Sequence, residues 1–226
     1  MQLFLDTASL DAIRRWQPFG VVEGATTNPA LLAKEGGDPL EQLVNVAELV
    51  AGPVSAQVTA SEAEGMVAQG RSLAALAANI VVKVPATLAG CAAARRLTES
   101  GVRCNVTLTF HPAQAIAFAR IPVAYVSLIV GRTEDFGLET RAEIARTREL
   151  LAALGTETKL LVASLRNPAQ LAAAVLGGAD VVTVPPATWD LVYQNPLSLQ
   201  GLADFHSAWT TLPAERRARY ERLGER

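Results

Sequence analysis

Cysteine, histidine and lysine are all scarce in this chain of 226 residues. Its two cysteines, Cys91 and Cys104, and its two histidines, His111 and His206, show none of the close spacing that marks a metal site. We therefore expect no metal centre. So few cysteines also indicate the reducing environment of a cytoplasmic protein.

Long apolar runs and a strong net charge are missing as well. No apolar stretch approaches the roughly 20 residues of a membrane-spanning helix, and we expect no signal peptide before Leu3. The formal net charge of −2 argues against nucleic acid or an anionic membrane as the main partner. Residues 215–226 hold several arginines, but glutamates are interleaved with them, which is typical of a solvated helix end.

Lys83 stands inside the apolar run 80–85, whose sequence IVVKVP is typical of a strand buried on both faces of a parallel sheet. The other two lysines, Lys34 and Lys159, lie in a polar turn and at the start of another strand. A buried ammonium without a partner is costly, and it relieves that cost by losing its proton. The neutral amine is then a nucleophile. The alternative is a strand-end lysine whose side chain reaches solvent.

Strand-like and helix-like segments alternate along the chain. Helix-start signals include Ser9, which can cap a helix through Trp16, and the pair Asn28-Pro29. A last helical stretch is broken at Asn195-Pro196 and is suited to contact a neighbouring subunit. The predicted strands cover residues 3–7, 21–27, 54–59, 79–84, 103–109, 123–130, 159–163 and 180–184.

Eight such units in 226 residues average about 28 residues each, which favours a (β/α)₈ barrel, an α/β fold. A doubly wound open sheet is the alternative, but it usually carries a glycine-rich loop after its first strand, and residues 6–9 (DTAS) form no such loop. We expect a single barrel domain over residues 1–226, in which residues 196–226 form a C-terminal helical extension. We also expect a homo-oligomer.

Polar side chains stand at or near the carboxyl ends of seven predicted strands, where barrels of this kind place their chemistry. Each alone could be a turn or cap residue. Asp6 is the most informative after Lys83, because a carboxylate in an apolar strand indicates an ion pair or a proton-transfer role. The candidates are Asp6, Thr26, Asn28, Gln57, Lys83, Asn105, Thr107, Ser127 and Ser164.

Two arginines follow the sixth and seventh strands. Arg132 comes after Val130-Gly131, and Arg166 comes after Ser164 and just before the helix start Asn167-Pro168. Two guanidinium groups, a hydroxyl and a helix N-terminus at one rim form a candidate phosphate site. Together with Lys83 they indicate a phosphorylated carbonyl substrate.

Six ordered motifs resemble those of the transaldolase family, in its short branch that also includes fructose-6-phosphate aldolases. The resemblance extends from Leu3 to about Pro196. In this sequence the motifs read LDTA at 5–8, TTNP at 26–29, VKVP at 82–85, CNVTL at 104–108, VGR at 130–132 and ASLRN at 163–167.

The resemblance implies aldol chemistry through a Schiff base, with sugar phosphates as substrates in carbohydrate metabolism such as the pentose phosphate pathway, and with no cofactor. Lys83 would form the imine and Asp6 would move the proton of the C4 hydroxyl. Gln57 and Thr107 would hold a catalytic water. The implied substrate ligands are Thr26, Asn28, Asn105 and Ser127 for hydroxyls, and Arg132, Ser164 and Arg166 for phosphate.

Four positions bear on the activity within the family, and they disagree. Gln57 matches the aldolases, since transaldolases carry glutamate there. Asn105 and Ser127 resemble transaldolases. Ile129 matches neither branch, because transaldolases usually have phenylalanine and the aldolases have a tyrosine that acts as an acid. Without that acid, transfer to an aldose phosphate is favoured over release of free dihydroxyacetone.

Two hypotheses about function, from classes other than aldol chemistry, stay open. A non-catalytic sugar-phosphate-binding barrel would predict loss of Lys83 or Asp6, and both are present. A barrel isomerase without a Schiff base would need a carboxylate base and an electrophile but no buried lysine.

Overall fold

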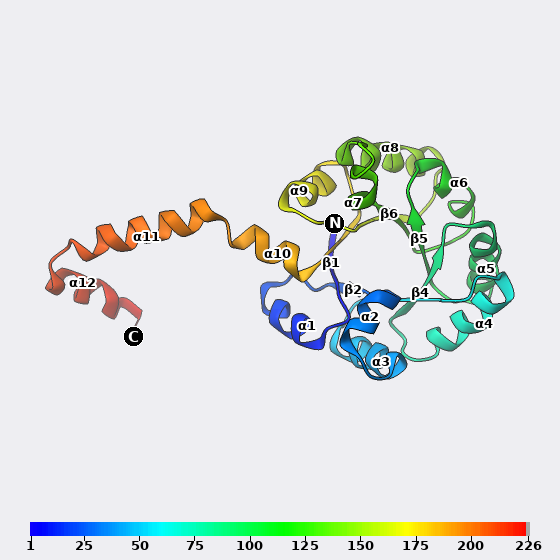
Figure 1. Ribbon diagram of the computed structural model, residues 1–226, viewed down its shortest axis with the longest axis horizontal. Coiled ribbons are helices and arrows are strands. Elements are labelled where there is room, and N and C mark those ends of the chain that lie inside the picture. The colour runs from blue at the N-terminus through cyan, green and yellow to red at the C-terminus, as the bar shows by residue number, and fades with distance from the viewer. Residues whose placement is uncertain (225–226) are drawn as a thin grey trace. The chain divides into compact units, whose positions relative to one another are not determined.

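Eight parallel strands close into a barrel in the computed structural model of the protein, which describes residues 1–224 (Figure 1). Each strand pairs with the next, and β8 pairs with β1. The predicted (β/α)₈ barrel is confirmed. The strands are β1 (Gln2–Asp6), β2 (Gly24–Thr26), β3 (Val54–Gln57), β4 (Ile80–Pro85), β5 (Cys104–Thr109), β6 (Tyr125–Ile129), β7 (Lys159–Ala163) and β8 (Val181–Val184).

Helices cover the outside of the barrel, and local capping explains where several of them begin. The Ser9 hydroxyl accepts a hydrogen bond from the Ala12 backbone N–H, and the Asn28 side chain accepts one from Leu31. These helices are α1 (Leu10–Trp16), α2 (Pro29–Glu35), α3 (Pro39–Leu49), α4 (Ala63–Ala74), α5 (Leu88–Glu99), α6 (Ala115–Phe118), α7 (Val130–Glu134), α8 (Thr140–Ala153) and α9 (Pro168–Leu176).

Two features of this layer differ from the sequence-based expectation. The predicted sixth strand was to end at Val130, but β6 ends at Ile129 and Val130 already begins α7. Arg132 therefore lies on a short helix at the rim. The sequence analysis also predicted no helix over residues 39–49, where the structure has α3. Asp38 caps α3 and Pro39 begins it, a cap residue followed by proline just as at the start of α2.

The lower part of the barrel interior is an apolar layer. Side chains alternate between the two faces of a strand, and a buried cluster collects apolar residues from β1, β4, β6, β7 and β8. Phe4 and Tyr125 meet edge to face in this cluster, with ring centroids 6.0 Å apart. Val81, Leu161 and Val181 lie in the same layer, and Ile129 and Ala163 extend the cluster to the carboxyl ends of β6 and β7. This layer fills the barrel below its carboxyl-terminal rim, so the barrel is no open pore.

The described chain divides into two compact units, Met1–Thr188 and the part from Trp189 onward. The second unit contains most of α10 (Pro186–Tyr193), then α11 (Pro196–Thr210), α12 (Ala214–Glu221) and η3 (Arg222–Gly224). The break at Asn195-Pro196 is confirmed, since Asn195 caps α11.

A C-terminal helical extension beginning at residue 196 is therefore present, although residues 225 and 226 of the predicted range lie outside the described part. That this extension and the barrel form one domain stays a prediction. None of the helices described is both long enough and apolar enough to cross a membrane.

Candidate active site

A polar layer lies next to the apolar one, nearer the carboxyl ends of the strands. Residues two positions apart on a strand point to the same side, so the next inward-facing residue of several strands is polar. Two residues after Phe4 on β1 stands Asp6, and two residues after Val81 on β4 stands Lys83. Ser127 follows Tyr125 on β6 in the same way, as Thr183 follows Val181 on β8. The fold thus gathers polar residues from distant parts of the chain at the carboxyl ends of the strands.

Lys83 is buried, with 6% of its surface exposed, and its Nζ donates to the Thr27 carbonyl oxygen at 3.1 Å. It does not reach solvent in the way the alternative interpretation required. In register it lies between Gln57 on β3 and Asn105 on β5. Loss of hydration lowers the pKa of Lys83 from its ordinary value of 10.5, and the Asp6 carboxylate partly opposes this. The burial therefore favours a neutral amine.

Asp6 is partly buried at the end of β1 and accepts a hydrogen bond of 2.7 Å from the Thr26 hydroxyl. Burial raises the pKa of Asp6, while the Lys83 cation and the Thr26 hydrogen bond act in the opposite direction. The Thr26 and Thr183 hydroxyl oxygens are also 2.7 Å apart. Because Thr26 has one proton and gives it to Asp6, Thr183 must donate in that second contact.

Asn105 is fixed by two side chains inside the barrel. Its Nδ2 donates to the Ser55 hydroxyl at 3.0 Å, and its Oδ1 accepts from the Ser127 hydroxyl at 2.6 Å. All three residues are fully buried. Such a satisfied polar network holds the amide in one orientation next to Lys83.

Gln57, Asn28 and Thr107 lie around this layer. Gln57 is partly exposed and lines a cavity of about 740 Å³ whose other walls are mostly apolar side chains of α2, α3 and α4. The Asn28 Oδ1 caps α2, which leaves its amide nitrogen for other partners. Thr107 is buried on β5, and its carbonyl accepts a hydrogen bond from the Ala86 N–H.

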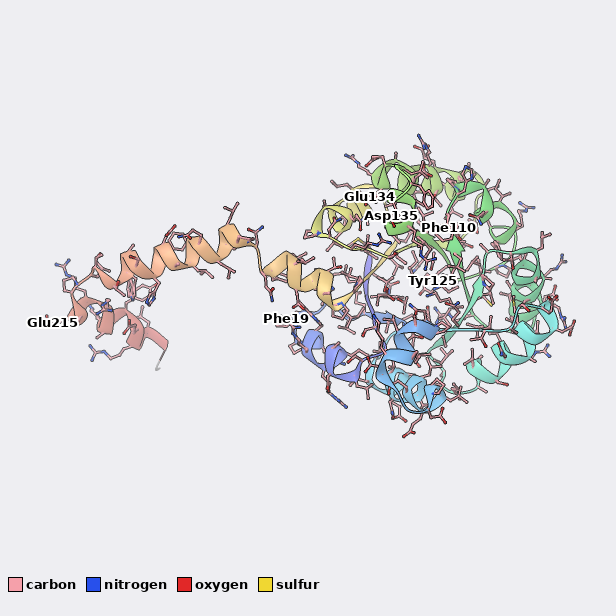
Figure 2. All side chains as sticks on the ribbon, in the orientation of Figure 1. Phe19, Phe110, Tyr125, Glu134, Asp135 and Glu215 are labelled. Atoms are coloured by element: carbon pink, nitrogen blue, oxygen red, sulfur yellow. The ribbon has the colours of Figure 1, made fainter. Side chains whose placement is uncertain are left out.

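The candidate phosphate residues lie at the rim formed by β6, α7 and β7. Arg132 is exposed and lies over the Phe110 ring, 5.8 Å from its centroid. Arg166 Nη1 donates to both carboxylate oxygens of Asp135, at 2.7 and 2.8 Å. Phe110 and Asp135 can be found near α7 in Figure 2. Ser164 has a φ of 67°, a left-handed conformation that is strained for a residue with a side chain.

Sequence reasoning missed Thr183 and Ser55, which hydrogen bond directly to predicted site residues. Thr183 is the one polar residue in β8, so the rule used for the other seven strands would also have found it. Ser55 precedes Gln57 by two residues and faces the same side. Asp135 was missed because nothing local indicates its pairing with Arg166. Among residues 1–224, no three His, Cys, Asp or Glu side chains gather closely enough to hold a metal ion.

The sequence matches the transaldolase/fructose-6-phosphate aldolase family over residues 3–221. The chain belongs to this family. It is 43% identical to a probable transaldolase of Caulobacter sp. (strain K31) over 209 residues, which are 92% of this chain and 96% of that protein. A probable transaldolase of Methanococcus maripaludis (strain DSM 14266) is 41% identical over 209 residues, 92% of this chain and 97% of the other.

A more distant family relative, a probable transaldolase of Lactiplantibacillus plantarum, is 38% identical over 214 residues, 95% of this chain and 99% of the other. Among solved structures, the carboxyl transferase domain of Rhizobium etli pyruvate carboxylase aligns with a TM-score of 0.57 and 11% identity, covering 81% of this chain and 40% of that one. That likeness concerns the fold alone. Within the transaldolase/fructose-6-phosphate aldolase family, this chain therefore has full-length relatives at about 40% identity.

Proposed function

We propose that this protein is a transaldolase that moves a dihydroxyacetone unit from a ketose phosphate, such as fructose 6-phosphate, to an aldose phosphate through a Schiff base on Lys83. The observation that carries the proposal is the burial of Lys83 beside Asp6 in a barrel of this family. Desolvation lowers the pKa of the amine, and only the neutral amine attacks a carbonyl.

The reaction begins when the Lys83 nitrogen adds to the C2 carbonyl, and the resulting carbinolamine takes up a proton from solvent and loses water to give a protonated imine. Asp6 then accepts the proton of the C4 hydroxyl, the C3–C4 bond breaks, and its electron pair moves into the imine as an enamine. An aldose phosphate leaves. In the reverse direction the enamine attacks the aldehyde of the acceptor, and Asp6 returns the proton. Hydrolysis of the new imine restores the free amine.

The Asp6 environment suits this exchange of one proton. Burial raises the pKa of its carboxyl group, while the Thr26 hydroxyl and the Lys83 cation stabilise the carboxylate. These opposing effects make both protonation states accessible during the cycle. Thr183 supports the arrangement by donating to Thr26.

The remaining polar residues would position the substrate and a water molecule. Asn105 and Ser127, with Thr26 and Asn28, would bind the hydroxyl groups of the dihydroxyacetone unit, and the Ser55–Asn105–Ser127 network supplies a rigid amide for this. Gln57, next to Lys83 in register, and Thr107 would hold the water released and consumed at the imine. Fixed donors of this kind bind without first having to be ordered.

Phosphate binding is assigned to Arg132, Ser164 and Arg166. Both arginines lie exposed at the barrel rim, beyond the carboxyl ends of β6 and β7, and Lys83 stands near the same end of β4. Guanidinium groups bind phosphate through several parallel hydrogen bonds, which a lone ammonium does not reproduce. The substrate would thus be held at both ends, with its carbonyl in the barrel and its phosphate at the rim.

The second candidate activity is fructose-6-phosphate aldolase, which protonates the enamine and releases free dihydroxyacetone. Gln57 favours it. Transaldolase is favoured by Asn105, by Ser127 and by Ile129, a buried aliphatic residue that has no proton to donate.

A product assay on fructose 6-phosphate, with and without erythrose 4-phosphate, separates these two activities. Transfer requires the acceptor. Rapid release of glyceraldehyde 3-phosphate and dihydroxyacetone without it would assign the protein to the aldolases. Gln57→Glu should raise transfer relative to release, because a carboxylate orders the water more strongly; an unchanged ratio would show that this position does not control the partition.

We also propose that the protein is a cytoplasmic homo-oligomer that acts in carbohydrate metabolism. Large apolar side chains are exposed on α11, with 82% of Leu197, 64% of Leu202 and 75% of Phe205 accessible. An apolar helix face of this kind fits a subunit interface. Light scattering should give a mass above that of one chain, and Leu202→Glu with Phe205→Glu should lower it. A wild-type mass equal to one chain would contradict the proposal.

A further inference from the structure

We propose that Asp135 is a positioning residue that holds the Arg166 guanidinium in the orientation required for the phosphate of the substrate. This inference rests on the proposed function only in naming Arg166 as a phosphate ligand. Asp135 directly follows α7, so it belongs to the same rim segment as Arg132. Its carboxylate faces Arg166, which lies 31 positions further along the chain beyond β7.

The geometry of the pair leaves part of the guanidinium free to bind. Both carboxylate oxygens of Asp135 contact the same nitrogen, Nη1, at 2.7 and 2.8 Å. The contacts therefore do not use Nε and Nη2. An arginine presents its N–H donors in a rigid planar fork, so the contact at Nη1, together with the covalent attachment of the group at Nε, restricts the directions of the remaining donors.

A second observation shows where the fixed guanidinium points. A β-carbon built on Gly131 would lie 3.0 Å from Arg166 Nε and 3.0 Å from the Ser164 hydroxyl oxygen. Two of the proposed phosphate donors therefore converge beside the same glycine. The same carbon would lie 2.1 Å from the Ser164 carbonyl oxygen, so only a glycine at 131 allows α7 to approach this segment closely enough to bring the two donors together.

The backbone of Arg166 is anchored independently of its side chain. Its N–H donates to the Gln170 side-chain oxygen at 2.7 Å, and the Gln170 amide nitrogen in turn contacts Glu134 at the end of α7. Residues at the end of α7 thus hold Arg166 at two points, Glu134 through Gln170 and Asp135 directly. Restricting a long side chain before binding reduces the entropy that the ligand would otherwise have to overcome.

Asp135 is poorly suited to a purely structural role. The side chains of Arg166 and Asp135 are 49% and 54% exposed, and exposed pairs of this kind add little to stability. A competing interpretation is that Asp135 blocks Arg166 and that phosphate must displace it. The use of Nη1 alone favours positioning, and the two interpretations predict opposite changes in affinity.

The test compares Asp135→Asn with wild type in two measurements. We expect the KM for fructose 6-phosphate, with erythrose 4-phosphate as acceptor, to rise about three- to fivefold, the effect of one exposed charge pair, while kcat changes less than about twofold. The concentration of unphosphorylated fructose that half-saturates borohydride trapping should stay unchanged. Asp135→Glu should restore part of the affinity.

The matched control is Glu64→Gln, which removes a carboxylate from the exposed pair between Glu64 and Arg96 on α4 and α5. It should leave both measurements unchanged. In an Arg166→Ala background, Asp135→Asn should have no further effect, because Asp135 acts through Arg166. An unchanged or lowered KM in Asp135→Asn, or full additivity with Arg166→Ala, would overturn the proposal.

Inorganic phosphate separates this proposal from the proposed function. Its binding, measured by calorimetry, requires no turnover. If the wild type binds phosphate and Asp135→Asn weakens that binding about three- to fivefold, Asp135 positions Arg166 even if no ketose is turned over. If fructose 6-phosphate is turned over but the variant binds phosphate like wild type, the positioning role is wrong and the proposed function stands.

Discussion

Gly131→Ala tests whether the close approach of α7 to the end of β7 is needed for phosphate binding. The added β-carbon would lie 2.1 Å from the Ser164 carbonyl oxygen and 3.0 Å from both the Ser164 hydroxyl and Arg166 Nε. The nearest atom belongs to the backbone, so it cannot move aside as the end of a flexible side chain can. Either α7 or the segment around Ser164 must shift.

The size of the shift follows from these distances. An ordinary van der Waals contact of a β-carbon begins near 3.4 Å, so the 2.1 Å separation requires a displacement of more than 1 Å. Inserting one carbon into a packed site costs typically about 1–3 kcal/mol. A misplacement of this size at a binding group can reduce turnover by up to about a hundredfold. We expect at least about a tenfold rise in the KM for fructose 6-phosphate.

Steady-state kinetics with fructose 6-phosphate and thermal unfolding check this prediction. Gly201→Ala is the control, because a β-carbon on that glycine of α11 meets no atom within 4 Å. The control should match the wild type in KM and be at least as stable. A Gly131→Ala variant with a wild-type KM would refute the argument that Ser164 and Arg166 must keep their present positions around Gly131.

Three further predictions address separate parts of the site. Arg166→Ala should raise the KM for fructose 6-phosphate about tenfold or more in steady-state assays and affect unphosphorylated ketoses much less; equal losses on both would mean that it only supports the rim. With Asp6→Asn, borohydride trapping of the imine on Lys83 should begin to increase at a lower pH than in the wild type, because the lost carboxylate no longer raises the pKa of that amine. An unchanged pH dependence of trapping would contradict this coupling. Ser127→Ala should lower the free energy of unfolding by about 1–3 kcal/mol in denaturant titrations, because it leaves the buried Asn105 oxygen unpaired. Wild-type stability would show that the hydrogen bond from Ser127 to Asn105 does not stabilise the fold.

Much of the fold follows from local sequence signals. Strand alternation and capping residues act over a few positions, so Ser9 and Asn28 could be assigned as helix starts from their neighbours alone. Lys83 was informative for a similar reason, since a single lysine in an apolar strand has few explanations. Its burial in the structure agrees with that expectation.

The contacts that complete the site depend on tertiary geometry. The sequence does not show that Thr183 reaches Thr26 across the closure of the barrel, because the two residues are 157 positions apart. The left-handed backbone conformation of Leu108 and Ser164 could not be predicted from the sequence either, because this conformation is expected at glycine and neither residue is one. Both strained residues lie at the rim near the proposed substrate site, where the surrounding fold maintains them.

The most direct test of the Schiff-base mechanism is borohydride reduction in the presence of fructose 6-phosphate, followed by peptide mass mapping. The adduct should lie on Lys83. Lys34 and Lys159 are exposed and should remain unmodified. Lys83→Ala should fold but lose both trapping and turnover, because no other side chain supplies a neutral amine at that position. An adduct on another lysine, or substantial turnover by Lys83→Ala, would contradict the mechanism.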